Sequence, residues 1–419
     1  MKPGFYTIMA AQFFSSLADN ALLIAAIALL LQLEAPQWMT PLLKLFFVVS
    51  YVLLAPYVGP FADSMPKGRV MFITNTIKVL GCLLMFYNVH PLAAYALVGL
   101  GAAAYSPAKY GILTELLPAE KLVIANGWIE GLTVGSIILG TFVGGALISP
   151  SVSNLLLTID LVPSVDTGID TAPEAAMCVI ILFYALAAIF NLRIPDTGIR
   201  YDRRGKHPIV LFRQFQKSFK VLWADPLGQV SLAVTTLFWG AGATLQFIVL
   251  KWAETALNMP LNQGALLQGI CAIGVAVGAV MAARFIPLRK SLRVILVGVA
   301  MGMVVMIMTF VTDKWIAFPL LIIIGGLSGF FVVPMNALLQ HRGHVLMSAG
   351  QSIAIQNFNE NLSVLTMLGL YALLIHLNFH VNTVIIMFGS FVTVAMVLVY
   401  FKHQNNQSRF NVEARIGLE

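Results

Sequence analysis

The feature that most constrains this chain is a series of twelve apolar segments, each longer than twenty residues, separated by polar stretches. A helix needs about twenty apolar residues to cross a hydrocarbon core of roughly 30 Å. Lipid offers no partner to backbone N–H and C=O groups, so segments of this length must be helical. The sequence therefore predicts an all-α membrane protein with twelve transmembrane helices. The segments lie near residues 5–33, 40–62, 69–89, 91–113, 122–149, 174–194, 226–251, 260–286, 292–313, 315–340, 347–376 and 380–401.

The amount and placement of charge agree with a membrane protein and predict its orientation. Only 10% of the residues are charged, whereas a soluble domain carries about 25%. Of the 25 Lys and Arg residues, 21 fall on the side of the membrane that holds both predicted termini. Because cationic residues favour the cytoplasmic side, we expect both termini and the central loop to be cytoplasmic. The net charge of +7 then reflects membrane topology, and a nucleic-acid partner is not expected.

The second half of the chain repeats the first. Pro107 and Pro334 each follow a glycine-rich stretch, and they are 227 positions apart. Three further matches at similar offsets are Asp19 with Gln246, Asn126 with Gln356, and Glu130 with Glu360. Because each half has six predicted spans, the two repeats run in the same direction through the membrane. Parallel six-helix repeats are the arrangement of major facilitator transporters, which this organisation resembles.

This repeat predicts four parts of the chain: a six-helix bundle at 1–194, a cytoplasmic linker at 195–225, a second bundle at 226–402 and a polar tail at 403–419, expected to be disordered. Within the linker, residues 208–223 alternate apolar and basic side chains at helical spacing. This pattern predicts an amphipathic helix on the inner leaflet. The alternative is a linker whose composition is amphipathic without membrane contact.

The loop between the second and third segments resembles the loop motif of major facilitator transporters. Gly59 is followed four residues later by Asp63 and then by the basic residues Lys67 and Arg69. Glycine lets helices approach closely, and the carboxylate can pair with cationic side chains and helix ends. We expect these four residues to act at a cytoplasmic gate.

Ionisable side chains inside predicted spans are the main candidates for function, because each costs about 2.5–3.5 kcal/mol on insertion scales. Asp19, next to Asn20, is interpreted as a ligand for a headgroup or coupling ion; the alternative is an internal salt bridge with Lys78. Glu130 and Glu360, both near the midplane, can bind a cationic amine or carry protons. Their alternative is a local hydrogen bond to neighbouring Asn side chains.

Four stretches resemble the bacterial lysophospholipid transporters of the major facilitator superfamily: 18–22, 102–113, 238–242 and 329–340. The resemblance implies a transporter in the bacterial inner membrane that flips lysophosphatidylethanolamine and lysophosphatidylglycerol from the outer to the inner leaflet by alternating access. It also implies a cytoplasmic partner, an acyltransferase/acyl-carrier-protein synthetase that reacylates the lipids.

The same resemblance, together with the polar residues inside the predicted spans, indicates a set of substrate-binding residues. They are Asp19, Asn20, Lys109, Asn126, Glu130, Gln246, Asn336, Gln356, Asn357 and Glu360. Lys109 either holds a phosphate or snorkels to the inner surface. Gln246 is a departure, because the resemblance leads us to expect Arg there. A neutral Gln246 cannot hold a phosphate by charge, and Lys251 is the nearest substitute.

Two other classes of function are considered. A proton-coupled exporter of drugs or small solutes would use Asp19, Glu130 and Glu360 as proton carriers. A membrane acyltransferase would need a His followed five positions later by an acidic residue, and none of the seven His residues has that partner. We therefore expect no enzyme, no catalytic residues, no cofactor and no metal site.

Overall fold

The computed structural model describes residues 3–36, 39–158, 169–199, 201, 207–259 and 261–416. Within these ranges the chain is helical and has no strand, which confirms the all-α prediction. The helices before the linker are α1 (Pro3–Gln32), α2 (Met39–Leu53), α3 (Ala55–Asp63), α4 (Lys67–Phe86), α5 (Pro91–Leu116), α6 (Leu122–Ile148), α7 (Pro150–Thr158) and α8 (Ala172–Leu192). After α9 (Pro208–Ala224) come α10 (Gly228–Ala256), α11 (Leu261–Phe285), α12 (Ile295–Ile307), α13 (Lys314–Leu346), α14 (Ala349–His376) and α15 (Val381–Phe410).

Ten helices of the described chain are long and apolar enough to cross a membrane, and the number is eleven if the bent pair of α2 and α3 is one span. The bend of 67° interrupts the predicted segment 40–62. Pro56 lies at the start of α3 and lacks the N–H that would continue the α2 ladder. The remaining predicted segment, 91–113, forms α5, whose 26 residues measure roughly 39 Å at the usual helical rise. Pro107 lies inside α5, next to the polar residues Ser106 and Lys109.

The helices form two compact units. The first contains residues 1–112 and 135–211, and the second contains residues 113–134 and 212–419. The first part of α6 therefore groups with the helices of the second repeat, although chain order places all of α6 in the first. The division at 194 and 226 remains a prediction about the repeats.

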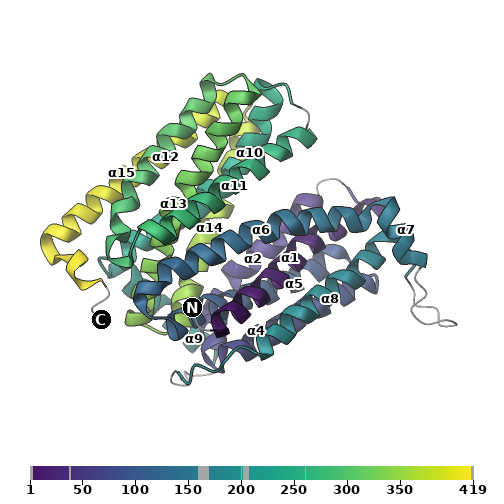
Figure 1. Ribbon diagram of the computed structural model, residues 1–419, viewed down its shortest axis with the longest axis horizontal. Helices are drawn as coiled ribbons and strands as arrows, with labels where there is room; N and C mark the ends of the chain where they lie inside the picture. The colour runs from purple at the N-terminus through teal and green to yellow at the C-terminus, as the bar shows by residue number, and fades with distance from the viewer. Residues whose placement is uncertain are drawn as a thin grey trace. The chain divides into compact units, whose positions relative to one another are not determined.

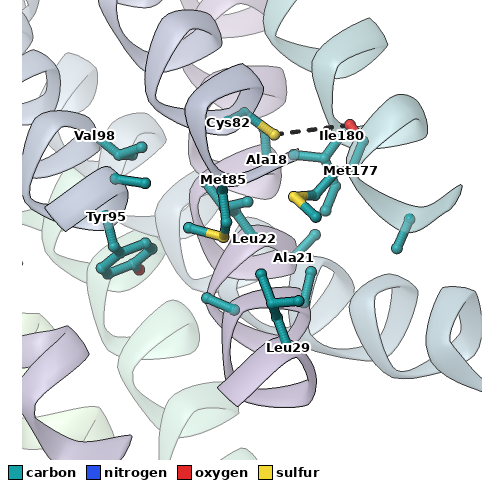
Figure 2. Close-up of a cluster of buried hydrophobic side chains, with 14 of the residues drawn as sticks. Ala18, Ala21, Leu22, Leu29, Cys82, Met85, Tyr95, Val98, Met177 and Ile180 are labelled. Carbon is teal, nitrogen blue, oxygen red and sulfur yellow. Dashed lines mark hydrogen bonds between the residues drawn. The ribbon is translucent and has the colours of Figure 1, made fainter. Parts of the chain in front are cut away.

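In the first unit, α1 and α4 both pack against α8 (Figure 1). Small residues allow this close approach. Figure 2 shows Ala18, Ala21 and Leu22 of α1 among the buried side chains of the neighbouring helices. The Cys82 thiol donates to the Met177 carbonyl oxygen at 3.8 Å and is a free, buried thiol within this apolar cluster.

In the second unit, α11 and α13 (Figure 1) cross at glycines on both helices. A Cβ on Gly278 would collide with the Gly326 carbonyl, and a Cβ on Gly325 would collide with the Cys271 carbonyl. Backbones approach this closely only where the side chain is a hydrogen atom.

The glycines of α6 are used in two ways. Gly127 faces Ala279 and Ala283 of α11, and Gly140 and Gly144 face the α1 backbone, so these three provide close contacts. A Cβ on Gly131, Gly135 or Gly145 would meet nothing within 4 Å. Glycine density alone therefore overstates the number of close helix contacts.

Residues 150–158 form the short helix α7, with Pro150 at the helix start where its missing N–H is harmless. The expectation that the tail is disordered is wrong. The tail is ordered through residue 416: α15 runs to Phe410, and its buried Asn406 donates to the Pro226 carbonyl at 2.9 Å. The residues outside the description include Lys2, Asp160, Asp166, Arg200, Arg203, Arg204, Lys206 and 417–419.

Candidate transport site

Asp19 of α1 forms an ion pair in the first unit. Its Oδ2 lies 2.8 Å from Lys78 Nζ on α4, and its Oδ1 accepts a hydrogen bond of 2.7 Å from the Tyr184 hydroxyl on α8. The Lys78 side chain is 1% exposed and that of Asp19 is 21% exposed. The salt bridge with Lys78, which the sequence left as the alternative, is therefore formed.

Polar and aromatic groups complete the surroundings of Lys78. Its ammonium donates to Ser15 Oγ at 3.0 Å, and Ser15 in turn donates to Asn75 Oδ1 at 2.9 Å. The rings of Tyr105 and Tyr184 lie 5.0 and 5.6 Å from Nζ, within range of a cation–π interaction. Asn20, in contrast, uses its Nδ2 for the Ser16 carbonyl of its own helix. This part of the site is a preorganised, electrically neutral cluster.

A second polar cluster lies in the second unit and begins with a pair of amides. Asn126 of α6 and Gln340 of α13 exchange two hydrogen bonds, each of 2.9 Å. Both side chains are buried. The Asn126 amide also donates to the Leu122 carbonyl at 2.9 Å. This pair joins residues 214 positions apart.

One turn further along α6, two carboxylates are linked by two amides. Asn336 Nδ2 donates to Glu130 Oε1 at 3.4 Å, while Gln356 Nε2 donates to Asn336 Oδ1 at 3.0 Å and to Glu360 Oε1 at 2.7 Å. All four side chains are buried. We call Glu130, Asn336, Gln356 and Glu360 the acceptor chain. The sequence predicted all four as site residues, and the structure brings them together.

One acceptor of the acceptor chain lacks a donor among the described residues. Gln356 Oε1 is buried and has no hydrogen-bond partner among the described residues. Both amide N–H groups of Gln356 point to oxygens within the chain, and a carboxylate offers only acceptor oxygens. A group that supplies donors and positive charge, such as an ammonium, complements this arrangement.

Three other predicted residues have different surroundings. Asn357 is buried next to Gln356 on α14. Gln246 is exposed on α10, and its backbone carbonyl accepts from Gln268 Nε2 at 3.1 Å. Lys109 is buried on α5 with its ammonium 4.0 Å from the Tyr110 ring. Burial of Lys109 differs from the exposed ammonium that snorkelling predicts.

Two of the four predicted gate residues form a local ion pair. Lys67 Nζ lies 2.5 Å from Asp63 Oδ1 and donates to the Ala62 carbonyl at 2.9 Å. Gly59 is buried in α3, and Arg69 is exposed at the start of α4. Asp63 thus has a cationic partner four residues away, within its own loop.

One buried ion pair is not predicted by the sequence. Arg342 of α13 donates from Nε and a terminal nitrogen to the two oxygens of Asp225, at 2.9 and 2.8 Å. Asp225 Oδ1 also accepts from the backbone N–H groups of Leu227 and Gly228, at 3.1 and 2.7 Å. The available signal was Asp225 directly before the predicted segment 226–251, a pattern typical of capping residues; nothing in the sequence pointed to Arg342.

Residues 8–363 match the family model described as Major Facilitator Superfamily. The chain is 43% identical over 371 residues to "Lysophospholipid transporter LplT" from Yersinia pestis (strain Pestoides F), an overlap of 88% of this chain and 86% of the relative. The same values apply to "Lysophospholipid transporter LplT" from Yersinia pseudotuberculosis serotype O:3 (strain YPIII).

Solved structures share the fold at low identity. A bacterial homologue of the iron transporter ferroportin in the outward-facing state has a TM-score of 0.73 and 14% identity, covering 97% of this chain and 100% of that chain. The transporter FucP in the outward conformation has a TM-score of 0.71 and 12% identity, covering 96% of this chain and 98% of that chain.

Proposed function

The chain belongs to the major facilitator superfamily, and on this premise we propose that it flips lysophospholipids from the outer to the inner leaflet by alternating access. It is a multi-pass membrane protein. Its relatives are transporters and not enzymes, as the sequence predicted. The proposed substrates are lysophosphatidylethanolamine and lysophosphatidylglycerol, delivered for reacylation.

The acceptor chain is the observation that carries this proposal. The ammonium of an ethanolamine headgroup supplies a donor for Gln356 Oε1 and a positive charge beside the carboxylates of Glu130 and Glu360. A glycerol headgroup supplies hydroxyl donors without charge. The relatives named LplT agree with a lysophospholipid as cargo. Lys109 is the proposed partner of the phosphate, because Gln246 has no charge.

Asp19 remains a proposed headgroup ligand, although it is paired with Lys78. A zwitterionic headgroup carries one charge of each sign, so it can replace both partners of the ion pair without leaving a charge uncompensated. The 21% exposure of the Asp19 side chain gives access from one side. A substrate with a single positive charge would instead pair with Asp19 and leave Lys78 buried and unpaired, at high cost.

The membrane location, the cytoplasmic partner and the gate residues of the transporter are also proposed. The excess of Lys and Arg on one predicted side supports an inner-membrane location with both termini in the cytoplasm. The cytoplasmic partner is an acyltransferase/acyl-carrier-protein synthetase that consumes the flipped lipid, as the sequence resemblance implies. Gly59, Asp63, Lys67 and Arg69 are proposed as gate residues.

A proton-coupled exporter is the second candidate, and the same acceptor chain favours it. Two buried carboxylates bridged by amides share hydrogen bonds that adjust when one carboxylate takes a proton. A proton-coupled exporter requires that a proton gradient drive transport.

The first test is uptake of radiolabelled lysophosphatidylethanolamine by spheroplasts that lack their own transporter, with and without the full-length protein. We expect protein-dependent conversion of the label to diacyl lipid, unchanged by a protonophore. Glu254→Gln serves as a matched carboxyl control, since Glu254 is exposed. No protein-dependent label, with protein in the membrane and several lyso-lipids tried, would exclude the flippase. Export that stops with the protonophore would identify the second candidate.

A further inference from the structure

Helix α9 has one face that packs on the protein. Phe215 and Leu222 are buried, and Phe219 is half-buried. The Phe215 and Phe219 rings lie 5.6 and 6.1 Å from the Phe358 ring of α14, both edge-on. The amphipathic helix predicted from the sequence is therefore formed. Two of its aromatic side chains, Phe215 and Phe219, contact α14.

The opposite face of α9 is basic and exposed. Arg213, Lys217 and Lys220 follow one another at spacings of four and three residues, so they share a single stripe. Phe212, 46% exposed, and Val221, 39% exposed, lie on either side of that stripe. The helix contains no Asp or Glu, so its own sequence supplies no anion to neutralise these cations.

We propose that this outward face of α9 binds the phosphate groups of anionic phospholipids in the adjacent leaflet. Three cations on one stripe match a surface of phosphates, and such attraction is the usual basis of recognition by basic segments next to a membrane span. Phe212 and Val221 then enter the boundary between headgroups and acyl chains, as apolar residues of interfacial helices do.

The position of α9 and the order of its side chains favour lipid over an acidic protein. Helix α9 ends at Ala224, and the spanning helix α10 begins at Gly228, so the stripe is close to a membrane boundary. A protein interface typically has an apolar centre and a charged rim. Here the charges form the centre and the apolar side chains form the edges. This inference does not depend on which solute the protein transports.

The test is amide hydrogen exchange of residues 208–224 in the full-length protein, reconstituted into nanodiscs of phosphatidylcholine alone or with about 30% phosphatidylglycerol. We expect exchange in α9 to be at least about threefold slower with phosphatidylglycerol at low salt, and this difference to disappear near 0.5 M salt. The triple variant Arg213→Gln, Lys217→Gln, Lys220→Gln should lose the difference.

A matched control removes three other exposed cations, Arg289, Lys290 and Arg293 of the short helix η2 (Leu288–Val294). That variant should keep the slower exchange, because its α9 stripe is intact. Equal exchange in the two lipid compositions, or equal loss in both triple variants, would overturn the proposal. So would protection that needs a cytoplasmic protein fraction and not phosphatidylglycerol.

Discussion

Asn126 and Gln340 donate to each other's amide oxygens at 2.9 Å in both directions, a reciprocal pair between α6 and α13. Residues of the first repeat and of the second thus share one buried polar contact within a single compact unit. Since each amide supplies the hydrogen-bond partner of the other, removing one leaves the other buried without that partner.

This reciprocity predicts non-additive mutant effects. Asn126→Leu or Gln340→Met alone should lower the free energy of unfolding by about 1–3 kcal/mol, because the remaining amide stays buried without its partner. The double variant should lose less than the sum of the two. Thermal unfolding of the detergent-solubilised wild type, the two single variants and the double variant measures these stability changes. Strictly additive losses would show that the two amides do not act as a pair.

The Asp19–Lys78 pair predicts unequal effects of removing either charge. Asp19→Asn leaves the 1% exposed Lys78 ammonium uncompensated, whereas Lys78→Met leaves a carboxylate that is 21% exposed. We expect Asp19→Asn to lower the free energy of unfolding by about 3–5 kcal/mol and Lys78→Met to lower it by less. The double variant should recover part of the stability that Asp19→Asn loses.

The control for this experiment is the exposed pair Lys251–Glu254, where Glu254→Gln should cost no more than about 1 kcal/mol. Full stability of Asp19→Asn combined with complete loss of transport would contradict a structural role. It would assign Asp19 to the substrate alone.

Adjacent glycines on α13 provide a matched test of helix packing. A Cβ on Gly325 would collide with the Cys271 carbonyl of α11, while a Cβ on Gly326 would approach the Gly274 carbonyl only to 3.8 Å. Gly325→Ala should therefore lower stability by about 1–3 kcal/mol or more, and Gly326→Ala should be tolerated. Fluorescence-detected gel filtration after heating compares them. Equal behaviour would mean that α11 and α13 do not approach each other at Gly325.

The helices were predictable because lipid forces each backbone group to bond within its own segment. The break between α2 and α3 was not predicted, because Pro56 lies within a continuous run of apolar residues that has the length of a single span. The tail was misjudged because its polar composition conceals the buried Asn406, which contacts the Pro226 carbonyl. Composition predicts only the average tendency of a segment to be ordered or disordered, and one specific contact can order a polar segment.

The candidate site was predictable where the repeat pointed to it. Glu130 and Glu360 stand out because a buried charge in a span is rare, and both lie in the acceptor chain. The ion pair of Asp19 with Lys78 could not be chosen over the alternative, because the sequence does not show which faces of α1 and α4 meet. Asp225 and Arg342 are 117 positions apart and share no spacing pattern.

Glu360→Gln tests the role of charge in the acceptor chain. The new amide keeps an oxygen to accept from Gln356 Nε2, which is 2.7 Å from Glu360 Oε1 in the wild type, so folding should change little. Attraction to an ammonium is lost. We expect uptake of lysophosphatidylethanolamine to fall by about tenfold or more, as for the loss of a charge-assisted hydrogen bond, and uptake of lysophosphatidylglycerol to fall less. Competition between the two labelled lipids in spheroplasts measures this ratio, with Glu254→Gln as the control. An equal fall for both lipids would mean that Glu360 does not recognise the ammonium and serves a step common to all substrates.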